Sequence, residues 1–354
     1  METRYLLRKD HLLPLLRRLQ KGHRLVAPAR NRHGDTFYAE VRDLDRFHLD
    51  LDTPPQESAK RFFLPQQEVL FTYRTDGPEG YGFSPVVAPS PPTVYFGLRP
   101  CDLTAILYTD LVLLKERRDP GYQRRRQEAV LIALGCSRPR ASCFCNATKS
   151  GPFLDFGYDL QLTDLGDRFF VEVGRARGRQ LVEDWHPFFA EAGEEDVKAQ
   201  YQVALEAAGS FERSVDLDLA VRALADHGGS DALWAELASR CQGCGGCAFL
   251  CPTCTCYTLR DQCLGPSHGE RLRCWDACTL AGFTRMAGGH NPADPGRDVL
   301  RRRFEHKLRD SVRQHGRPSC VGCGRCVGSC FGGVDMLMAI ERLAGEAEPP
   351  EEGV

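Results

Sequence analysis

The sequence predicts an α+β protein in which an N-terminal mixed α/β domain is followed by a mainly α-helical domain. Short apolar segments, separated by turns that contain Gly or Pro, occupy residues 20–175. Beyond that stretch the apolar residues recur at helical spacing instead. The 17 cysteines are divided in a similar way, because four lie between Cys101 and Cys145 and the other thirteen lie from Cys241 to Cys330.

The N-terminal part is predicted to begin with a surface helix that Asp10 opens, because leucines alternate there with charges at helical spacing. The segment TVYFGLRPCDLTAILYTDLVLL is typical of a buried strand, a turn at Arg99 and Pro100, and then a helix. Asp102 is the predicted N-cap of that helix, so that Cys101 lies on the turn. The predicted strands are RLVAPA (24–29), TFYAEV (36–41), TVYFGL (93–98), AVLIAL (129–134) and RFFVEV (168–173).

The C-terminal part is predicted to contain four longer helices, two of which lead directly into cysteine-rich segments. We therefore place an α/β domain at residues 1–190 and an α-helical domain at residues 191–345. The acidic, Pro-rich residues 346–354 are expected to form a flexible tail. The predicted helices are 194–208, 215–226, 231–240 and 297–314.

Composition excludes several classes of function. A formal net charge of −2 is unlike that of a general nucleic-acid binder. The longest apolar runs are far shorter than the roughly 18 residues that a membrane helix needs, and the N-terminus does not resemble a secretory signal. An odd number of cysteines in tight Cys-x-x-Cys steps suits metal thiolates better than disulfides, so we expect a reducing, cytoplasmic location.

Two segments share the spacing Cys-x2-Cys-x2-Cys-x3-Cys: CQGCGGCAFLCP (241–252) and CVGCGRCVGSC (320–330). In ferredoxins with two clusters, the fourth cysteine of each such run binds the other cluster. Structural zinc sites usually contain two separated Cys-x-x-Cys pairs and not a run of four, so 4Fe-4S clusters are favoured and the domain is predicted to be ferredoxin-like. The crossing predicts one cluster on Cys241, Cys244, Cys247 and Cys330, and another on Cys320, Cys323, Cys326 and Cys251.

Four more cysteines are expected to converge in the N-terminal domain. Cys101 and Cys136 each follow a predicted strand, so neighbouring strands of one sheet would place both at its carboxyl edge. Cys143 and Cys145 follow on the adjoining loop. Four convergent thiolates suit a third 4Fe-4S cluster, and zinc or simple packing satisfies the same pattern.

The remaining cysteines and the cofactor motifs give weaker signals. Cys256, Cys263 and Cys274 are expected to be buried packing residues, because free cysteine is often buried, whereas the roles of Cys254 and Cys278 stay open. No Gly-x-Gly-x-x-Gly lies between a predicted strand and helix, so the chain is not expected to bind flavin or nicotinamide itself. Without a two-electron cofactor, the chain can relay single electrons but needs a partner at each end.

Several unusual segments occur together and in a fixed order: FGLRPCDLTAI, ASCFCNATKSGP, CPTCTCYTLRD, RCWDACTLAGFTRMAGGHNP and CVGCGRCV. With them the chain resembles the β subunit of cytoplasmic NAD(P)-linked [NiFe] hydrogenases (sulfhydrogenases), a group that also includes one of the subunits of anaerobic sulfite reductase. The resemblance implies a non-catalytic iron-sulfur protein that connects a catalytic subunit with a flavin-containing, NAD(P)H-oxidising one. The resemblance implies that the catalytic partner is a [NiFe] hydrogenase, a sulfite reductase or a heterodisulfide-reductase module.

The resemblance also bears on the cysteines. The family pattern contains Cys101, Cys136, Cys143 and Cys145, which implies that these four act together. Two other readings stay open at this point: a zinc-stapled scaffold with no redox role, and a self-sufficient reductase with an unrecognised flavin pocket in the N-terminal domain.

Overall fold

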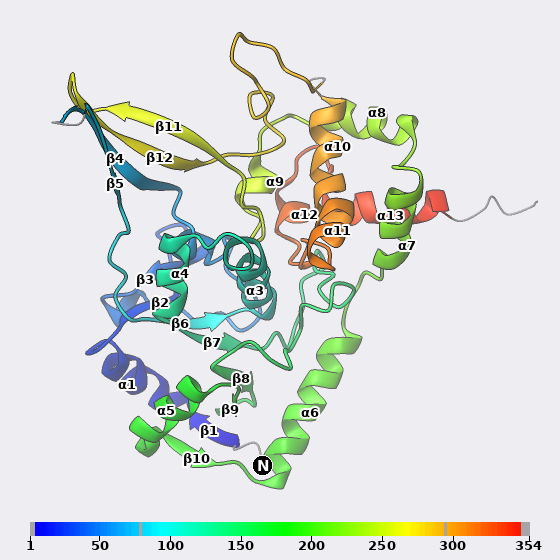
Figure 1. The fold of residues 1–354 in the computed structure, drawn as a ribbon. Helices are drawn as coiled ribbons and strands as arrows, with labels where there is room; N and C mark the ends of the chain where they lie inside the picture. The colour runs from blue at the N-terminus through cyan, green and yellow to red at the C-terminus, as the bar shows by residue number, and fades with distance from the viewer. Residues whose placement is uncertain (1–3, 78–79, 294–295, 348–354) are drawn as a thin grey trace, which may run out of the picture.

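The computed structural model describes residues 4–77, 80–293 and 296–347. An eight-stranded sheet with helices on its two faces forms the N-terminal half, and helices form much of the C-terminal half (Figure 1). A four-stranded sheet contains strands from both halves of the chain. The described part of the chain contains no helix that is long and apolar enough to cross a membrane.

The eight-stranded sheet has the order β10-β1-β9-β8-β7-β6-β2-β3. Four consecutive strands, β8, β7, β6 and β2, are parallel, and the strands on either side of them pair antiparallel. All five predicted strands are confirmed. Every residue of β6 is buried, as expected for a parallel strand covered on both faces. The strands are β1 (Arg4–Arg8), β2 (Arg24–Arg30), β3 (Thr36–Glu40), β6 (Thr93–Leu98), β7 (Ala129–Leu134), β8 (Leu160–Asp164), β9 (Arg168–Val173) and β10 (Phe189–Glu191).

Helices cover both faces of this sheet. Leucines of α1 and α5 pack with one face, while α2, α3 and α4 supply apolar side chains to the other. The mixed α/β prediction for this half is therefore confirmed. The helices are α1 (Lys9–Leu19), α2 (Lys60–Phe63), α3 (Pro100–Leu114), α4 (Pro120–Gln127) and α5 (Ala176–Asp184), with short 3₁₀ turns η1 (Leu44–Arg46) and η2 (His186–Phe188).

Two predicted helix starts are wrong by one or more residues. α1 begins at Lys9 with Arg8 as its N-cap, and Asp10 instead forms an ion pair with Arg8 over 2.7 Å. α3 begins at Pro100, whose fixed φ suits the first position of a helix, so Arg99 is the N-cap. Asp102 therefore lies inside the first turn, where its side chain is free to take another role.

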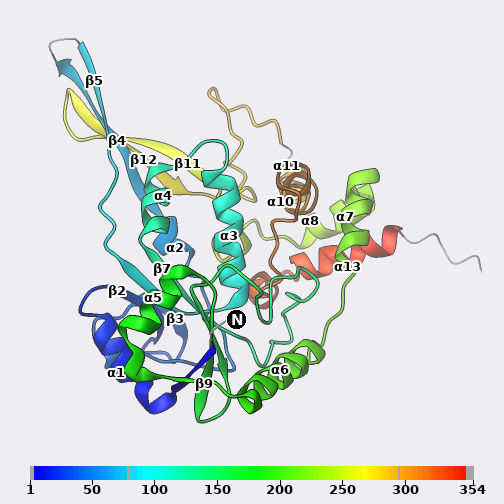
Figure 2. The same cartoon turned by 60° about the horizontal axis from the view of Figure 1, so that its bottom comes forward.

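The four-stranded sheet has the order β11-β12-β4-β5, and all its pairs are antiparallel. It consists of β4 (Gln67–Gly77), β5 (Gly80–Pro85), β11 (Tyr257–Cys263) and β12 (His268–Trp275). Both views show it extending away from the larger sheet (Figures 1 and 2). The hairpin of β11 and β12 lies between the two cysteine runs, so the prediction of a mainly α-helical C-terminal domain is not confirmed.

α7, α8, α10 and α13 pack around one core that contains Trp234, Phe304 and Ile340, whereas α6 lies against β8 and β9. The first, second and third predicted helices correspond to α6, α7 and α8. The fourth is interrupted by a five-residue π-helical turn, η3. Of the predicted tail, residues 346–347 end α13, and residues 348–354 lie outside the described part. The elements are α6 (Glu194–Gly209), α7 (Leu217–Asp226), α8 (Asp231–Arg240), α9 (Gly246–Phe249), α10 (Arg297–Glu305), η3 (His306–Asp310), α11 (Ser311–His315), α12 (Arg325–Ser329) and α13 (Met336–Ala347).

Candidate metal centres

The two cysteine runs form the same local structure, a glycine-rich loop followed by one of the short helices α9 and α12. In each loop two glycines adopt positive φ, with values of 62° and 72° in the first run and 58° and 71° in the second. A residue with a Cβ atom is strained at these angles, so glycine permits the loop. The glycines are Gly243 and Gly245 in the first run, and Gly322 and Gly324 in the second.

A backbone N–H points at the first sulfur of each run. Gly243 donates to Sγ of Cys241 over 3.4 Å, and Gly322 donates to Sγ of Cys320 over 3.5 Å. Hydrogen bonds to sulfur are among the features by which a protein sets the potential of an iron-sulfur cluster. The two loops therefore share this feature as well as their backbone shape.

The fourth cysteine of the first run lies with the second run. A small cavity of about 20 Å³ is lined by Cys251 together with Cys320, Cys323 and Cys326. These are the four residues that the crossing predicts for one cluster. Burial raises the pKa of the Cys320 thiol to about 12, so this sulfur keeps its proton at neutral pH unless a metal displaces it.

The other predicted set is more open. Burial raises the pKa of the Cys247 thiol, Arg303 lowers it, and the nearby sulfurs of Cys251, Cys241 and Cys330 raise it further. Cys247 thus has both Cys241 and Cys330 as neighbours, as the crossing predicts. The remaining member of this set, Cys244, is exposed.

The structure also brings the four N-terminal cysteines together. β6 and β7 are parallel neighbours, so Cys101 at the start of α3 and Cys136 just after β7 lie at the same edge of the sheet. Burial raises the pKa of Cys145 well above its usual value, and the neighbouring sulfurs of Cys136 and Cys143 raise it further. The predicted convergence at the carboxyl edge of the sheet is therefore present in the structure.

This N-terminal group directly contacts the second cysteine run. Cys101 and Cys145 pack with Val321 and with Cys323. The backbone N–H of Phe144 donates to the carbonyl oxygen of Gly322 over 2.9 Å. A Cβ atom added to Gly322 would lie 2.5 Å from the Phe144 backbone, so the two loops touch backbone to backbone.

A buried ion pair joins the same two regions. Arg325, at the start of α12, donates to both carboxylate oxygens of Asp102 over 2.6 and 2.8 Å. The two side chains are 3% and 1% exposed. Asp102 is thus not a helix cap but the partner of a buried guanidinium, a role that its sequence neighbourhood did not indicate.

Comparison with known proteins agrees with this geometry. Residues 240–334 match the family described as "4Fe-4S dicluster domain". The chain is also 28% identical, over 347 residues, to "Sulfhydrogenase 2 subunit beta" of Pyrococcus furiosus (strain ATCC 43587 / DSM 3638 / JCM 8422 / Vc1). The alignment covers 95% of this chain and 97% of that protein.

The chain is a homologue of this sulfhydrogenase beta subunit. The family predicted from the sequence is therefore confirmed, and the presence of a 4Fe-4S dicluster domain supports an iron-sulfur protein with an electron-transfer role. Within that dicluster domain, or elsewhere among the described residues, no three His, Cys, Asp or Glu side chains are arranged to hold a single metal ion. A 4Fe-4S cluster has a different requirement, because each of its cysteines binds a different iron atom.

Three buried cations contact residues 253–254, which follow the first run. Lys60 donates to the carbonyl oxygens of Phe249 and Cys254, each over 3.2 Å, and its Nζ lies 4.0 Å from the ring centroid of Trp275. The other two, Arg303 and Lys307, line the cavity of the second run. Positive charge is thus concentrated at the junction of the two runs.

The five additional cysteines divide into two groups. Cys254, Cys256 and Cys278 are neighbours, and the contact with Cys278 lowers the pKa of Cys256 to about 6. Cys263 and Cys274 lie on the hairpin instead, and Cys263 is exposed, with its sulfur 3.7 Å from the hydroxyl of Tyr73. The expectation that Cys263 is buried is wrong, because β11 is an edge strand whose residues are all exposed.

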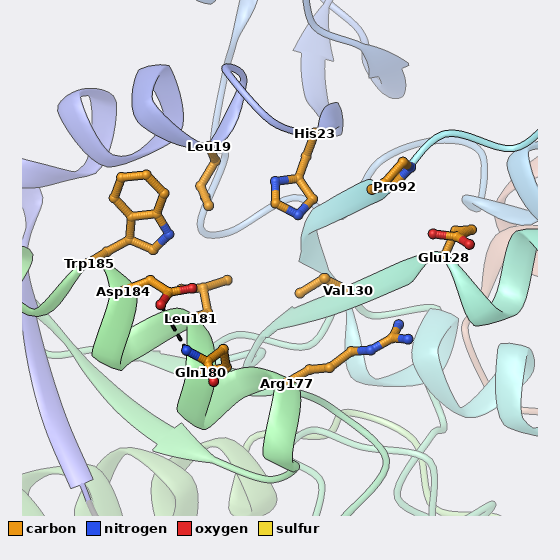
Figure 3. Close-up of a pocket in the computed structure, with 10 residues that line it drawn as sticks. All are labelled: Leu19, His23, Pro92, Glu128, Val130, Arg177, Gln180, Leu181, Asp184 and Trp185. Carbon is orange, nitrogen blue, oxygen red and sulfur yellow. Dashed lines mark hydrogen bonds between the residues drawn. The ribbon is translucent and has the colours of Figure 1, made fainter.

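A separate pocket of about 230 Å³ lies between α5, the end of α1 and the amino ends of β6 and β7 (Figure 3). Apolar side chains such as Leu19, Leu181 and Trp185 line it, and Gln180 donates to Asp184 there over 2.8 Å. The cysteines lie at the carboxyl ends of the same strands. This pocket therefore belongs to the opposite end of the sheet from the candidate metal centres.

Proposed function

We propose that this chain relays single electrons between its catalytic partner and a flavin-containing NAD(P)H-oxidoreductase subunit. The observation that carries the proposal is the cavity in which Cys251 from one run meets three cysteines of the other. Runs that exchange their fourth cysteine form one unit with two closely spaced clusters, and such a unit suits electron transfer. The homologue supports the wider setting, because its name describes part of a sulfhydrogenase.

The proposed ligands form three sets, two in the dicluster domain and one in the N-terminal domain. Each set contains four cysteines, which is the number that a 4Fe-4S cluster needs. We call them the first-run centre, the second-run centre and the N-terminal centre. They consist of Cys241, Cys244, Cys247 and Cys330; of Cys320, Cys323, Cys326 and Cys251; and of Cys101, Cys136, Cys143 and Cys145.

The contacts between these sets support an order for the relay. The N-terminal centre packs against Cys323, which belongs to the second-run centre. Cys251 links the second-run centre to the first run, because only three residues separate it from Cys247. The second-run centre therefore lies between the other two, and the exposed Cys244 makes the first-run centre the one closest to a partner on that side.

Metal analysis of the full chain, purified without oxygen, tests the proposal. Three centres require about twelve irons per chain and two require about eight. EPR spectra of the reduced protein would show interacting paramagnetic clusters. A colourless protein that contains zinc and no iron would contradict the relay and support a zinc-stapled scaffold.

Purification of a tagged chain with its native partners tests the two ends of the relay. We expect a flavoprotein and the subunits of a [NiFe] hydrogenase to co-purify, because the homologue is named as part of a sulfhydrogenase. Recovery of a sulfite reductase or of a heterodisulfide-reductase module would keep the relay but change the catalytic partner. Stoichiometric flavin on the isolated chain would contradict a relay without a flavin of its own.

A further inference from the structure

Arg303 and Lys307 are buried cations that have cysteines, and no carboxylate of the described residues, as their partners. Arg303 is 2% exposed and Lys307 is 3% exposed. In residues 4–77, 80–293 and 296–347, neither forms an ion pair, and the charged groups that act most strongly on both are cysteines. The contrast is Arg325, which is also buried but forms an ion pair with Asp102.

Both cations are held in place by neutral groups. Nζ of Lys307 donates to Oγ1 of Thr253 and to the carbonyl oxygen of Ser319, each over 3.0 Å. Nη2 of Arg303 donates to the carbonyl oxygen of Cys247 over 2.9 Å. These bonds orient the two cations but do not balance their charge.

The groups that orient Lys307 belong to both ends of the second-run centre. Thr253 follows Cys251 by two residues, and Ser319 immediately precedes Cys320. Arg303 and Lys307 both line the cavity formed by the four cysteines of this centre. Lys60, which is 8% exposed, contacts the same segment through its hydrogen bond to the carbonyl oxygen of Cys254.

The local helix geometry places these side chains on one side. Arg303 is in α10 and Lys307, four residues later, is in the π-helical turn η3. Oγ of Ser311 donates to the carbonyl oxygen of His306 over 2.7 Å within the same segment. π-helical turns occur often at functional sites, and this one carries the lysine that faces the cavity.

Buried cations are strongly destabilising without negative charge beside them, and the groups that supply it here are deprotonated cysteine sulfurs and not carboxylates. A 4Fe-4S cluster with four thiolate ligands is such a group, since its net charge is negative and becomes one unit more negative when it gains an electron. Fixed positive charge therefore stabilises the reduced form more than the oxidised form. The electron comes from a neighbouring centre, and no bond forms or breaks.

We propose that Lys307 and Arg303, supported by Lys60, are the counter-charges of the second-run centre and raise its reduction potential. In the relay, this makes the middle centre a better electron acceptor than the same four cysteines would be in neutral surroundings. The inference rests on the proposed function, because it assumes that the cavity holds a 4Fe-4S cluster. These residues act through the centre and are positioning residues in the relay.

An EPR-monitored redox titration of the full chain, purified without oxygen, tests the inference. In Lys307→Met the midpoint potential of the second-run centre should be lower than in the wild type, whereas Lys307→Arg should retain the wild-type potential. Lys60→Met should give a smaller shift in the same direction. Arg309→Met is the matched control, because Arg309 is on the same helical segment but forms ion pairs with Glu305 and Asp310.

The outcomes separate the inference from the function on which it rests. Wild-type protein without iron would contradict the proposed function itself. An unchanged midpoint potential in iron-replete Lys307→Met would overturn the counter-charge role and leave the relay intact. The same conclusion would follow if Lys307→Arg shifted the potential as much as Lys307→Met. If Lys307→Met loses the centre while Lys307→Arg keeps it, the need for a charge is supported, and the Lys60→Met potential then tests its sign.

Discussion

The two cysteine runs have the same spacing and the same loop shape, but their surroundings differ. The second run is enclosed by the N-terminal loop at Phe144 and by buried cations, whereas the first run has an exposed ligand candidate, Cys244. Phe331, which follows Cys330 of the first-run centre, is also fully exposed. The cysteine spacing therefore specifies the local fold of the loop, while the tertiary contacts determine whether that loop is enclosed within the protein or lies at its surface.

The difference extends to what each run contributes to stability. Contacts of the second run with the N-terminal half include a backbone hydrogen bond, a buried ion pair and the close approach of Gly322 and Gly324. The loop of the first run has Gly243 open to solvent. Changes in the second run should therefore affect the whole molecule, and equivalent changes in the first run should stay local.

The largest expected effect is that of Cys323→Ser. Loss of this ligand should remove the second-run centre and lower the apparent melting temperature of the whole chain, because metal ligation contributes to folding and Cys323 also packs on Cys101 and Cys145. Iron analysis and thermal unfolding measure the two effects. Cys263→Ser, on the exposed hairpin, is the matched control and should leave the iron content unchanged.

Asp102→Ala should be the next most disruptive change. It leaves Arg325 buried without its partner, and breaking one side of a buried ion pair destabilises a protein by about 3–5 kcal/mol. Denaturant unfolding of the iron-loaded chain measures this free energy. Asp261→Ala breaks an exposed ion pair with Arg271, for which we expect a much smaller loss because water screens the two charges. Equal losses in the two variants would show that burial does not control the effect.

Gly322→Ala and Gly243→Ala form a matched pair that compares the runs directly. Both glycines have positive φ, so an alanine costs roughly 1–2 kcal/mol at either position. At Gly322 the new methyl group also meets the Phe144 backbone, which adds about 1–3 kcal/mol, whereas nothing lies within 4 Å of it at Gly243. Unfolding free energies measure the difference, and equal values would show that the loops do not pack as tightly as the structure indicates.

Much of this arrangement could be predicted from the sequence because its signals are local. Continuous apolar runs such as TVYFGL and AVLIAL predicted β6 and β7, and the cysteine spacing predicted two equivalent loops. Their positions at the ends of neighbouring strands also predicted that Cys101 and Cys136 would lie at one edge of a sheet. In each case the prediction depended on residues that are close in sequence or on a general rule of sheet topology.

The features that sequence analysis missed depend on long-range contacts. The pairing of β12 with β4 joins segments almost 200 residues apart, and the exposed residues of β11 give no strong apolar alternation. The partner of Asp102 is 223 residues away in the sequence. Arg303 and Lys307 occupy a helix rich in charged residues, so only the tertiary structure distinguishes the two buried cations from their exposed neighbours.

Phe331→Ser should have the smallest effect on stability, and it tests whether the surroundings of the first-run centre are as exposed as the structure indicates. Phe331 is fully exposed and follows Cys330 directly, so its removal should change the unfolding free energy by no more than about 0.5 kcal/mol. The EPR spectrum of the first-run centre should also be unchanged, because the ligands and the glycine loop are intact. A large loss of iron or stability would mean that the first run is covered in the working protein, and that its exposure describes the isolated chain alone.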